Sequence, residues 1–266
     1  MLKEIIALEI LDDSLDGGTT KPMLVICDDG NKYVLKIFKE IHSKQRCYTG
    51  AEVCAYLLAK EFNLSIPDGA LIKIPIQLIE LIKNSNKSLY RELATKDYSK
   101  PCFGSLYLET LPTYTPTLKD KYLDLDELET IFAFDLFILN EDRKNTKPNI
   151  LKSSEHYFLI DHEKAFEGSA YALKQFKENE LVHYYKSHIF FQTLMKIEKK
   201  YPNSVNFETF IEFLRFLNLK TLRKQIERLE TLEYSVSECY EWLNYLEEIK
   251  KNSTKFVDLL KKNLDS

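Results

Sequence analysis

Hydrophobic and polar residues alternate in short runs over the first third of the chain, a pattern typical of β-strands. Apolar stretches cover residues 2–11, 22–27 and 32–38, and the turn-forming residues 28–31 (DDGN) predict a hairpin between the last two. Residues 50–63 instead repeat apolar side chains at three- and four-residue steps, which predicts a helix. The remaining pattern predicts strand-like runs at 70–82, broken by Pro75, no regular element at 83–101, and a strand at 103–111.

The pattern changes at residues 111–117 (LPTYTPT), which read as a stiff linker. A helix is predicted at 125–139, followed by a polar loop and two hairpin strands within 150–161. The rest of the chain is predicted to be helical near 178–199, 207–216, 218–231, 236–250 and 253–263. We therefore predict an α+β fold with two lobes: residues 1–110 hold an antiparallel sheet and one helix, and residues 111–266 are mostly helical.

Composition allows either one large domain or two lobes, and it narrows the classes of function. The 266 residues are 44% hydrophobic and 29% charged, enough for a substantial core. The net charge of −4 without a dense basic stripe argues against direct nucleic-acid binding. No apolar run approaches the roughly 20 residues that span a bilayer, and the amino terminus does not resemble a secretory signal. Five scattered cysteines without a C-x-x-C pair argue against a zinc site and a disulfide framework and are typical of a reducing compartment. Together these features lead us to expect a cytoplasmic protein without membrane contact.

Oxygen-donor side chains stand at the ends of apolar elements between residues 134 and 166. Asp142 lies in the polar loop NEDRKNTKPN, Asn149 closes that loop, and Asp161 ends the apolar strand HYFLI. Mg²⁺ prefers oxygen ligands and binds through a few side chains together with substrate phosphates. These positions suit a metal and phosphate site, although acids at such places also serve as helix caps or turn residues.

Two charged residues of the first lobe stand within apolar elements. Lys36 shares one face of its strand with Val34 and Phe38, so it either guards a sheet edge or pairs with an anion. Glu52 lies in the first turn of the helix at 50–63, where the helix dipole favours an acid. The functional alternative is that Glu52 points at the sheet and holds Lys36.

The segment DGGTTKP at residues 16–22 offers two glycines, two hydroxyls and a lysine. Exposed backbone N–H groups and the cation of Lys21 would suit a phosphate, with Thr19 and Thr20 beside it. The same residues also suit an ordinary hairpin turn, and they are not a Walker A motif.

The order of these features is more specific than any one of them. A strand lysine and a helix glutamate precede a linker, and N-x-D-R, P-N and an apolar strand ending in Asp follow it. Phosphoryl transfer needs a lysine for the phosphates, an acid to hold that lysine, oxygen ligands for Mg²⁺ and a carboxylate at the acceptor hydroxyl. Such chemistry depends mainly on positioning and charge neutralisation.

The runs FDLFILNEDRKNTKPNIL and FLIDHEKAF resemble the catalytic core of HipA-like kinases, specifically the small single-domain group with an N-x-D-R…N-P-N loop and an L-I-D-H strand. GTTKP, YVLKIF, AEVCAYLLAKEFNLSIP and FGSLYLE resemble the amino-terminal half of that group in the same order, so the resemblance covers residues 17–166. Aminoglycoside-type phosphotransferases usually have a histidine two places before the catalytic aspartate, where this chain has Asn140.

The resemblance implies a two-lobed protein-kinase-like fold, ATP and Mg²⁺ as cofactors, and a Ser or Thr hydroxyl of a protein as acceptor. It makes Asp142 the catalytic aspartate, with Lys36 on the nucleotide phosphates and Glu52 orienting it. It makes Asn149 and Asp161 the Mg²⁺ ligands. The other nucleotide-binding positions that it implies are Thr19, Thr20 and Lys21 over the phosphates and Glu109 at the hinge near adenine.

Two departures from kinase patterns accompany the resemblance. Asn149 follows Asp142 by seven residues, whereas the protein-kinase loop has a spacing of about five, so Asn145 is a rival metal ligand. Asp161 is followed by HEK rather than F-G, and Glu163 either adds a third acid near the metal or faces solvent; the second is our expectation.

The acceptor and partners are less determined by the sequence. Autophosphorylation is expected at Ser14, Thr19 or Thr20, because these hydroxyls lie near the phosphate loop. Some HipA-like proteins act as toxins paired with an antitoxin, and kinship alone extends that role and partner to this chain. The alternatives are a nucleotide-binding pseudokinase that acts by binding a partner, and a small-molecule kinase.

Overall fold

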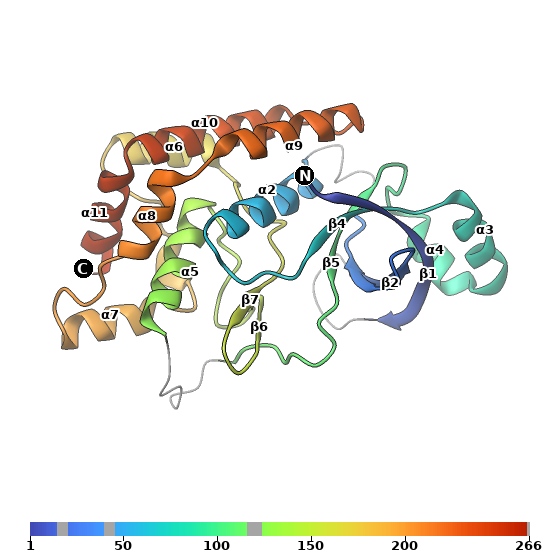
Figure 1. Ribbon diagram of the computed structural model, residues 1–266, viewed down its shortest axis with the longest axis horizontal. Coiled ribbons are helices and arrows are strands. Elements are labelled where there is room, and N and C mark those ends of the chain that lie inside the picture. The colour runs from blue at the N-terminus through green and yellow to red at the C-terminus, as the bar shows by residue number, and fades with distance from the viewer. Residues whose placement is uncertain (15–20, 40–45, 116–123, 265–266) are drawn as a thin grey trace.

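Figure 1 shows the computed structural model of the chain, which describes residues 1–14, 21–39, 46–115 and 124–264. A closed five-stranded sheet lies at one end of the molecule, a group of helices lies at the other, and helix α2 lies between them. The strands are β1 (Lys3–Ser14), β2 (Met23–Cys27), β3 (Lys32–Leu35), β4 (Gly69–Lys73) and β5 (Cys102–Leu106).

The sheet follows the order β1-β2-β3-β5-β4 and closes because β1 also pairs with β4. That closing pair is parallel, whereas the other four pairs are antiparallel, so the expectation of a wholly antiparallel sheet is wrong at this one seam. The predicted hairpin between β2 and β3 is confirmed. Its turn needs Gly30, whose φ of +79° suits a residue without a side chain.

The described residues of the first lobe form three helices rather than the one expected: α2 (Tyr48–Glu61), α3 (Ile76–Ser85) and α4 (Lys87–Leu93). The apolar run at 70–82 divides at Pro75, which follows β4 and forms the N-cap of α3. Beyond it, Leu78, Ile79 and Ile82 recur at helical steps and are buried against the barrel core. The polar segment after α3 forms α4, because the side chain of Asn86 accepts the backbone N–H of Leu89 at 3.1 Å and caps the helix.

The second half is helical around a short hairpin, as the sequence predicts. A left-handed Asn179 (φ 63°) follows the end of α6, so the single helix expected at 178–199 is wrong and a 3-10 turn and α7 replace it. The expected helices between residues 207 and 263 are confirmed. The elements are α5 (Leu125–Phe137), β6 (Ile150–Lys152), β7 (Tyr157–Leu159), α6 (Ser169–Lys177), η1 (His183–Ser187), α7 (Phe191–Lys200), α8 (Glu208–Phe216), α9 (Leu219–Thr231), α10 (Ser237–Lys251) and α11 (Ser253–Leu264).

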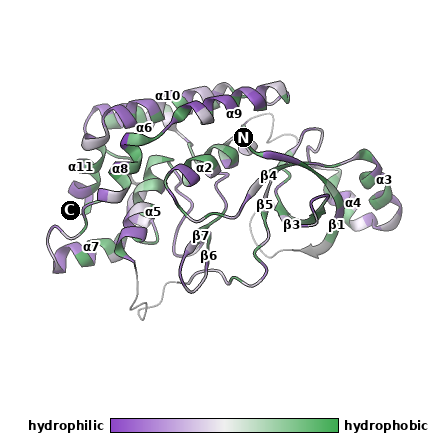
Figure 2. Ribbon diagram, in the orientation of Figure 1, coloured by the Kyte–Doolittle hydropathy of each residue, from purple (hydrophilic) through white to green (hydrophobic). Residues whose placement is uncertain are grey.

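Two apolar cores hold the molecule. One fills the barrel with inward side chains such as Val25, Tyr33 and Leu35. The other joins α2 to the helices, and Phe62 at the end of α2 stacks on Phe210 with ring centroids 5.0 Å apart. In Figure 2, α2 is largely hydrophobic, whereas α9 and α10 carry many hydrophilic residues. Helix α2 therefore belongs to the helical core by packing while it stands beside the sheet.

Helix α9 contacts the start of β1, and helix α10 contacts the start of α2. The backbone N–H of Leu2 donates to Gln225 Oε1 at 3.2 Å, and Arg228 of α9 donates to the carbonyl of Leu2 at 2.5 Å. The backbone N–H of Cys47, the N-cap of α2, donates to Glu238 of α10 at 3.3 Å. The beginnings of β1 and α2 are thus both fixed by helices from the far end of the sequence.

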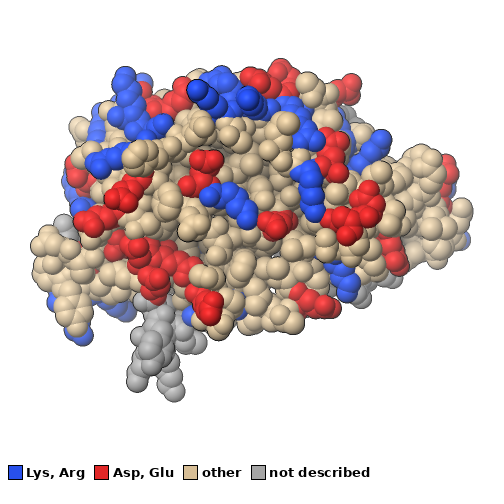
Figure 3. Space-filling model, in the orientation of Figure 1, with Lys and Arg blue, Asp and Glu red and all other residues tan. Residues whose placement is uncertain are grey.

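Surface and cysteine chemistry add two observations. On the face in Figure 3, acidic and basic side chains are interspersed, with a group of basic ones at the upper edge. All five cysteines are buried free thiols. Among the described residues, the helices are all too short or too polar to cross a membrane.

Candidate active site

Lys36 projects from the end of β3 into the space between the sheet and the helical part. Tyr33 and Leu35 face the barrel core, so period-two alternation turns Val34 and Lys36 to the opposite face. Lys36 Nζ lies 2.5 Å from Asp161 Oδ1 and forms an ion pair with Glu52. Burial lowers the pKa of Lys36, but the neighbouring carboxylates, led by Glu52, raise it above its ordinary value. The lysine is therefore a fixed cation, and the edge-strand explanation does not apply.

Glu52 connects the lysine to the strand that carries Asp161. One of its carboxylate oxygens pairs with Lys36, and Oε2 accepts the backbone N–H of His162 at 3.1 Å. Burial raises the pKa of Glu52, and the charge of Lys36 opposes this shift. Helix α2 begins at Tyr48 and has no acid in its first turn, so the expected first-turn position of Glu52 is wrong. Glu52 instead fixes both Lys36 and the backbone beside Asp161.

Asp161 and Asp142 are brought together by a lysine that the sequence analysis did not select. Lys147 Nζ lies 2.6 Å from Asp142 Oδ2 and 3.0 Å from Asp161 Oδ2. Burial raises the pKa of Asp161, but Lys36 and Lys147 together hold it well below the ordinary range. Lys147 reaches both acids because residues 144–147 form a tight turn, with Lys144 and Lys147 exchanging backbone hydrogen bonds at 3.0 Å.

A buried polar network beneath the loop sets its shape. Asp135 of α5 is fully buried and accepts from Arg143 Nε at 2.5 Å, His188 Nε2 at 2.9 Å and Asn140 Nδ2 at 2.9 Å. Burial raises the pKa of Asp135, but the charge of Arg143 and the hydrogen bond from His188 lower it by a larger amount. The net pKa is below the ordinary value, so the carboxylate stays charged. Arg143 also donates to the carbonyl of Asn149. The loop at residues 140–149 is therefore fixed at both ends by one buried carboxylate: Asn140 contacts Asp135 directly, and Asn149 does so through Arg143.

His162 lies on the other side of Arg143. Its Nε2 is 3.0 Å from an Arg143 nitrogen, and burial together with that guanidinium lowers the pKa of His162 to about 3. The imidazole is therefore neutral near pH 7 and accepts the hydrogen bond from Arg143. The histidine after Asp161 thus fixes the loop rather than carrying charge.

Asn149 and Asp161 fit the requirements of a hard metal ion. Asn149 is buried, and its side-chain nitrogen has no hydrogen-bond partner among the described residues. Its carbonyl accepts the N–H of Ile160 at 3.1 Å, which places it beside the residue preceding Asp161. Both residues have positive φ, 51° and 62°. An amide and a carboxylate oxygen form the donor set that Mg²⁺ prefers.

The structure places the remaining candidate residues as follows. Lys21 is exposed with a φ of 47°, whereas Thr19 and Thr20 lie outside the described residues. Glu109 is exposed in the segment after β5, and its Oε1 lies 3.6 Å from Lys32 Nζ. Asn145 is exposed in the turn at 144–147, so the geometry favours Asn149 of the two asparagines.

Glu163 differs from expectation. It is buried, and its Oε2 lies 3.9 Å from Lys36 Nζ, so the expectation that it faces solvent is wrong. Glu52, Asp161 and Glu163 each offer a carboxylate oxygen within 4.8 Å of the others, with Lys36 among them. The sequence carries one signal for the buried network around Asp135. This residue stands in the otherwise apolar run FAFDLF, where a charged side chain needs a buried partner.

Two cavities flank this cluster. A narrow one is lined by Val34 and Lys36 from β3, Phe103 and Ser105 from β5, and residues 159–162. It lies between the sheet and β7. A larger one, about 510 Å³, adjoins Glu163 on the side of residues 37–39. The charged residues therefore lie next to accessible space.

Comparisons with known proteins agree with this geometry. A family model described as HipA-like kinase matches residues 7–214. Among solved structures, the crystal structure of the Helicobacter pylori proinflammatory kinase CtkA aligns with a TM-score of 0.56 and 12% identity, covering 99% of this chain and 98% of that one. A crystal structure of the Golgi casein kinase covers 98% of this chain and 72% of that one at 15% identity, but its TM-score of 0.41 is too low to carry an argument. A search of curated proteins finds no match. The kinase-like fold predicted from the sequence is confirmed.

Proposed function

Because the chain belongs to the HipA-like kinase family, we propose that it transfers the γ-phosphate of ATP to a Ser or Thr hydroxyl of a protein in the presence of Mg²⁺. Family membership makes it a phosphotransferase of the kinase class. The acceptor hydroxyl, the protein substrate and the choice of Mg²⁺ are the parts that we propose.

One observation carries the proposal: an unbroken series of ion pairs joins the sheet to the catalytic loop. It runs from Glu52 to Lys36, from Lys36 to Asp161 at 2.5 Å, and through Lys147 to Asp142 at 2.6 Å. Kinases need this set of groups, namely a phosphate-binding lysine with its glutamate, a metal-binding aspartate and a carboxylate at the acceptor. Positive and negative side chains held this close together suit ATP with a bound metal ion, because the phosphates are anionic and the metal is cationic.

In the proposed reaction the acceptor oxygen forms a bond to the γ-phosphorus, and the bond from that phosphorus to the β,γ-bridging oxygen breaks, releasing ADP. The hydroxyl proton passes to the carboxylate of Asp142, whose side chain is partly exposed beside Lys147. Lys36, held by Glu52, binds phosphate oxygens through its fixed positive charge. Asn149 and Asp161 would hold Mg²⁺, which would neutralise phosphate charge.

Labelled phosphate transfer tests this proposal. Incubating the chain with γ-labelled ATP, Mg²⁺ and a cell lysate, followed by phosphoamino-acid analysis, should give labelled phosphoserine or phosphothreonine. Asp142→Asn should reduce incorporation by at least 100-fold, whereas the exposed control Asp258→Asn should leave it unchanged. If the wild-type chain binds ATP but transfers nothing, it is a nucleotide-binding interaction protein. Label confined to small molecules would favour the small-molecule kinase.

Two narrower parts of the proposal have tests of their own. Autophosphorylation at Ser14, Thr19 or Thr20 should add phosphate to peptides covering residues 12–22 after incubation with Mg²⁺ and ATP, and unmodified peptides would exclude it. A toxin role predicts growth arrest on expression that Asp142→Asn abolishes and a co-expressed antitoxin relieves.

A further inference from the structure

The 510 Å³ cavity beside Glu163 gathers side chains from four separate segments. One segment precedes β2, one follows β3, one covers the end of α4 and the residues after it, and one follows Asp161. Tyr48 of α2 closes one side. Tyr48 stacks on Phe38 with ring centroids 4.9 Å apart, so these two rings form an apolar wall of the cavity. The charged residues lining the cavity are Lys21, Lys39, Lys96, Lys164, Glu92 and Glu163.

Positive charge exceeds negative charge in this cavity. Lys21, Lys39 and Lys164 have no ion-pair partner in the part of the chain that the structure describes. Lys96 is deeper, with a side chain only 4% exposed, and lies 3.7 Å from Glu92. Its Nζ also donates to the carbonyl of Lys21 at 3.2 Å, which fixes the ammonium at the cavity wall. Burial lowers the pKa of Lys96, the neighbouring carboxylate of Glu92 opposes this shift, and the charges of Lys21 and Lys39 lower the pKa further.

The cavity adjoins the phosphate end of the site. Glu163 forms part of its wall, and the same carboxylate lies 3.9 Å from Lys36 Nζ. Lys36 in turn contacts Asp161. An anion in the cavity would therefore lie next to the carboxylate cluster that surrounds Lys36.

We propose that this cavity binds a phosphate or carboxylate group on the acceptor protein, so that hydroxyls near a phosphorylated or acidic residue are preferred. The inference rests on the proposed kinase function and specifies its substrate class. Ammonium groups recognise either anion as point charges, and a dianionic phosphate gains more from several of them than a carboxylate does. The order of preference is therefore phosphoserine, then glutamate, then glutamine.

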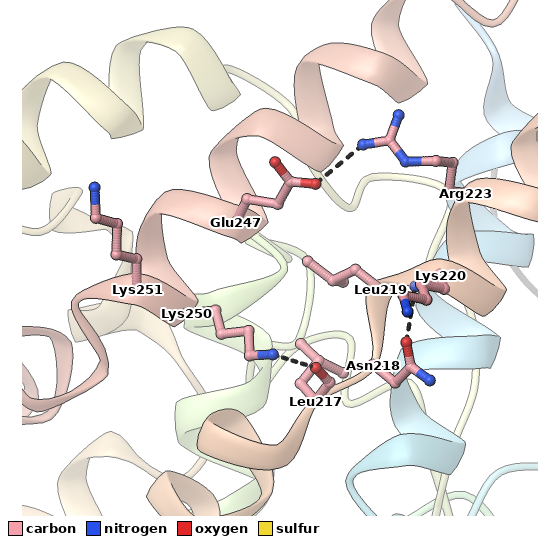
Figure 4. A pocket seen from close by; sticks show the side chains of 8 residues that line it. All are labelled: Leu217, Asn218, Leu219, Lys220, Arg223, Glu247, Lys250 and Lys251. Atoms are coloured by element: carbon pink, nitrogen blue, oxygen red, sulfur yellow. Dashed lines mark hydrogen bonds and ion pairs between the residues drawn. The ribbon is translucent and has the colours of Figure 1, made fainter.

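A second basic cavity provides a matched control. It measures about 420 Å³ and lies between the loop before α9 and helix α10 (Figure 4). Two of its cations are already engaged, because Arg223 pairs with Glu247 at 3.0 Å and Lys250 donates to the carbonyl of Leu217 at 2.6 Å. Lys220 and Lys251 at its edge are exposed, so their charges can be removed without breaking a buried contact.

The test compares Lys39→Gln/Lys164→Gln with Lys220→Gln/Lys251→Gln, in the full chain with Mg²⁺ and ADP present. Fluorescence anisotropy measures binding of three serine peptides that differ only in a neighbouring phosphoserine, glutamate or glutamine. We expect the first double variant to weaken phosphoserine-peptide binding by at least tenfold and the second to change it less than twofold. Circular dichroism melting confirms that both variants are folded.

Three results would overturn the inference. Equal losses in both double variants would mean non-specific charge attraction, and equal binding of the glutamine peptide would mean that no anion is recognised. A weakened affinity of Lys39→Gln/Lys164→Gln for ADP, with an unchanged affinity for the phosphoserine peptide, would assign the cavity to the nucleotide instead. Because peptide binding is measured without turnover, a chain that transfers no phosphate would contradict the proposed function and leave the binding result standing.

Discussion

Replacing Asp135 by Asn tests whether the buried network under the catalytic loop holds the fold. The substitution keeps the shape of the side chain and removes its charge. Arg143, which is fully buried, would then lose the carboxylate that it contacts at 2.5 and 3.2 Å. His188 and Asn140 would lose an ionised acceptor for their hydrogen bonds at 2.9 Å.

The expected loss of stability is about 4 kcal/mol. Removing one partner of a buried ion pair costs roughly 3–5 kcal/mol, because the remaining charge is left uncompensated in a medium of low polarity. An amide oxygen still accepts one hydrogen bond from Arg143, so the loss of the other contacts should not add fully to that figure. The exposed pair of Asp68 and Lys60, at 3.1 Å, provides the contrast, since such pairs contribute about 0–1 kcal/mol.

Urea unfolding measures both changes. Trp242 is the only tryptophan and stacks on Phe166 with centroids 4.9 Å apart, so its fluorescence reports the helical core. Asp135→Asn should lower the midpoint far more than Asp68→Asn, and adding Arg143→Met should restore most of the loss because no buried charge then remains. A loss below about 1 kcal/mol for Asp135→Asn, matching Asp68→Asn, would refute the reasoning.

Three further substitutions test other parts of the structure. Lys147→Met removes the cation between Asp142 and Asp161, so Mn²⁺ titrated in an electron paramagnetic resonance assay should bind about tenfold more tightly, a gain of about 1.4 kcal/mol, and unchanged or weaker binding would contradict this. Burial raises the pKa of Glu129 from 4.5 to about 7, so the folded protein binds a proton that the unfolded chain releases and loses stability as pH rises from 4.5 through 7. Glu129→Gln should therefore stabilise the protein by up to about 3 kcal/mol at pH 8 and by little at pH 4.5, and an equal effect at both pH values in urea unfolding would exclude the titration. Phe62→Ala should cost about 3–5 kcal/mol in the same assay, because its buried ring packs against four phenylalanines, and a cost below 1 kcal/mol would show that the core refills the space.

Local sequence patterns predict many of the helices and strands. The turn around Gly30 and the periodicities of α2 and α8–α11 could be predicted because each is determined by neighbouring residues. Helix α3 could not, because its apolar run satisfies both strand and helix patterns, and its packing against the barrel decides between them. The parallel pairing of β1 with β4 depends on how the whole sheet closes.

In the candidate site, too, some residues could be selected from the local sequence and others depend on the tertiary fold. Lys36, Glu52 and Asp161 could be selected because a charged residue within an apolar element is conspicuous, and the structure brings these three into contact. Lys147 could not, because its reach to both aspartates depends on the turn at 144–147. The burial of Glu163 depends likewise on the path of the chain after Asp161, which a single sequence does not reveal.

The attachment of α9 and α10 to the starts of β1 and α2 affects where this protein can be shortened. The family model ends at residue 214, before either helix begins. A fragment cut at that boundary would retain every proposed catalytic residue, yet Leu2 would lose Gln225 and Arg228, and Cys47 would lose Glu238. Helix α2, which bears Glu52, would then lose its contact with α10, so the carboxyl-terminal helices support both β1 and α2.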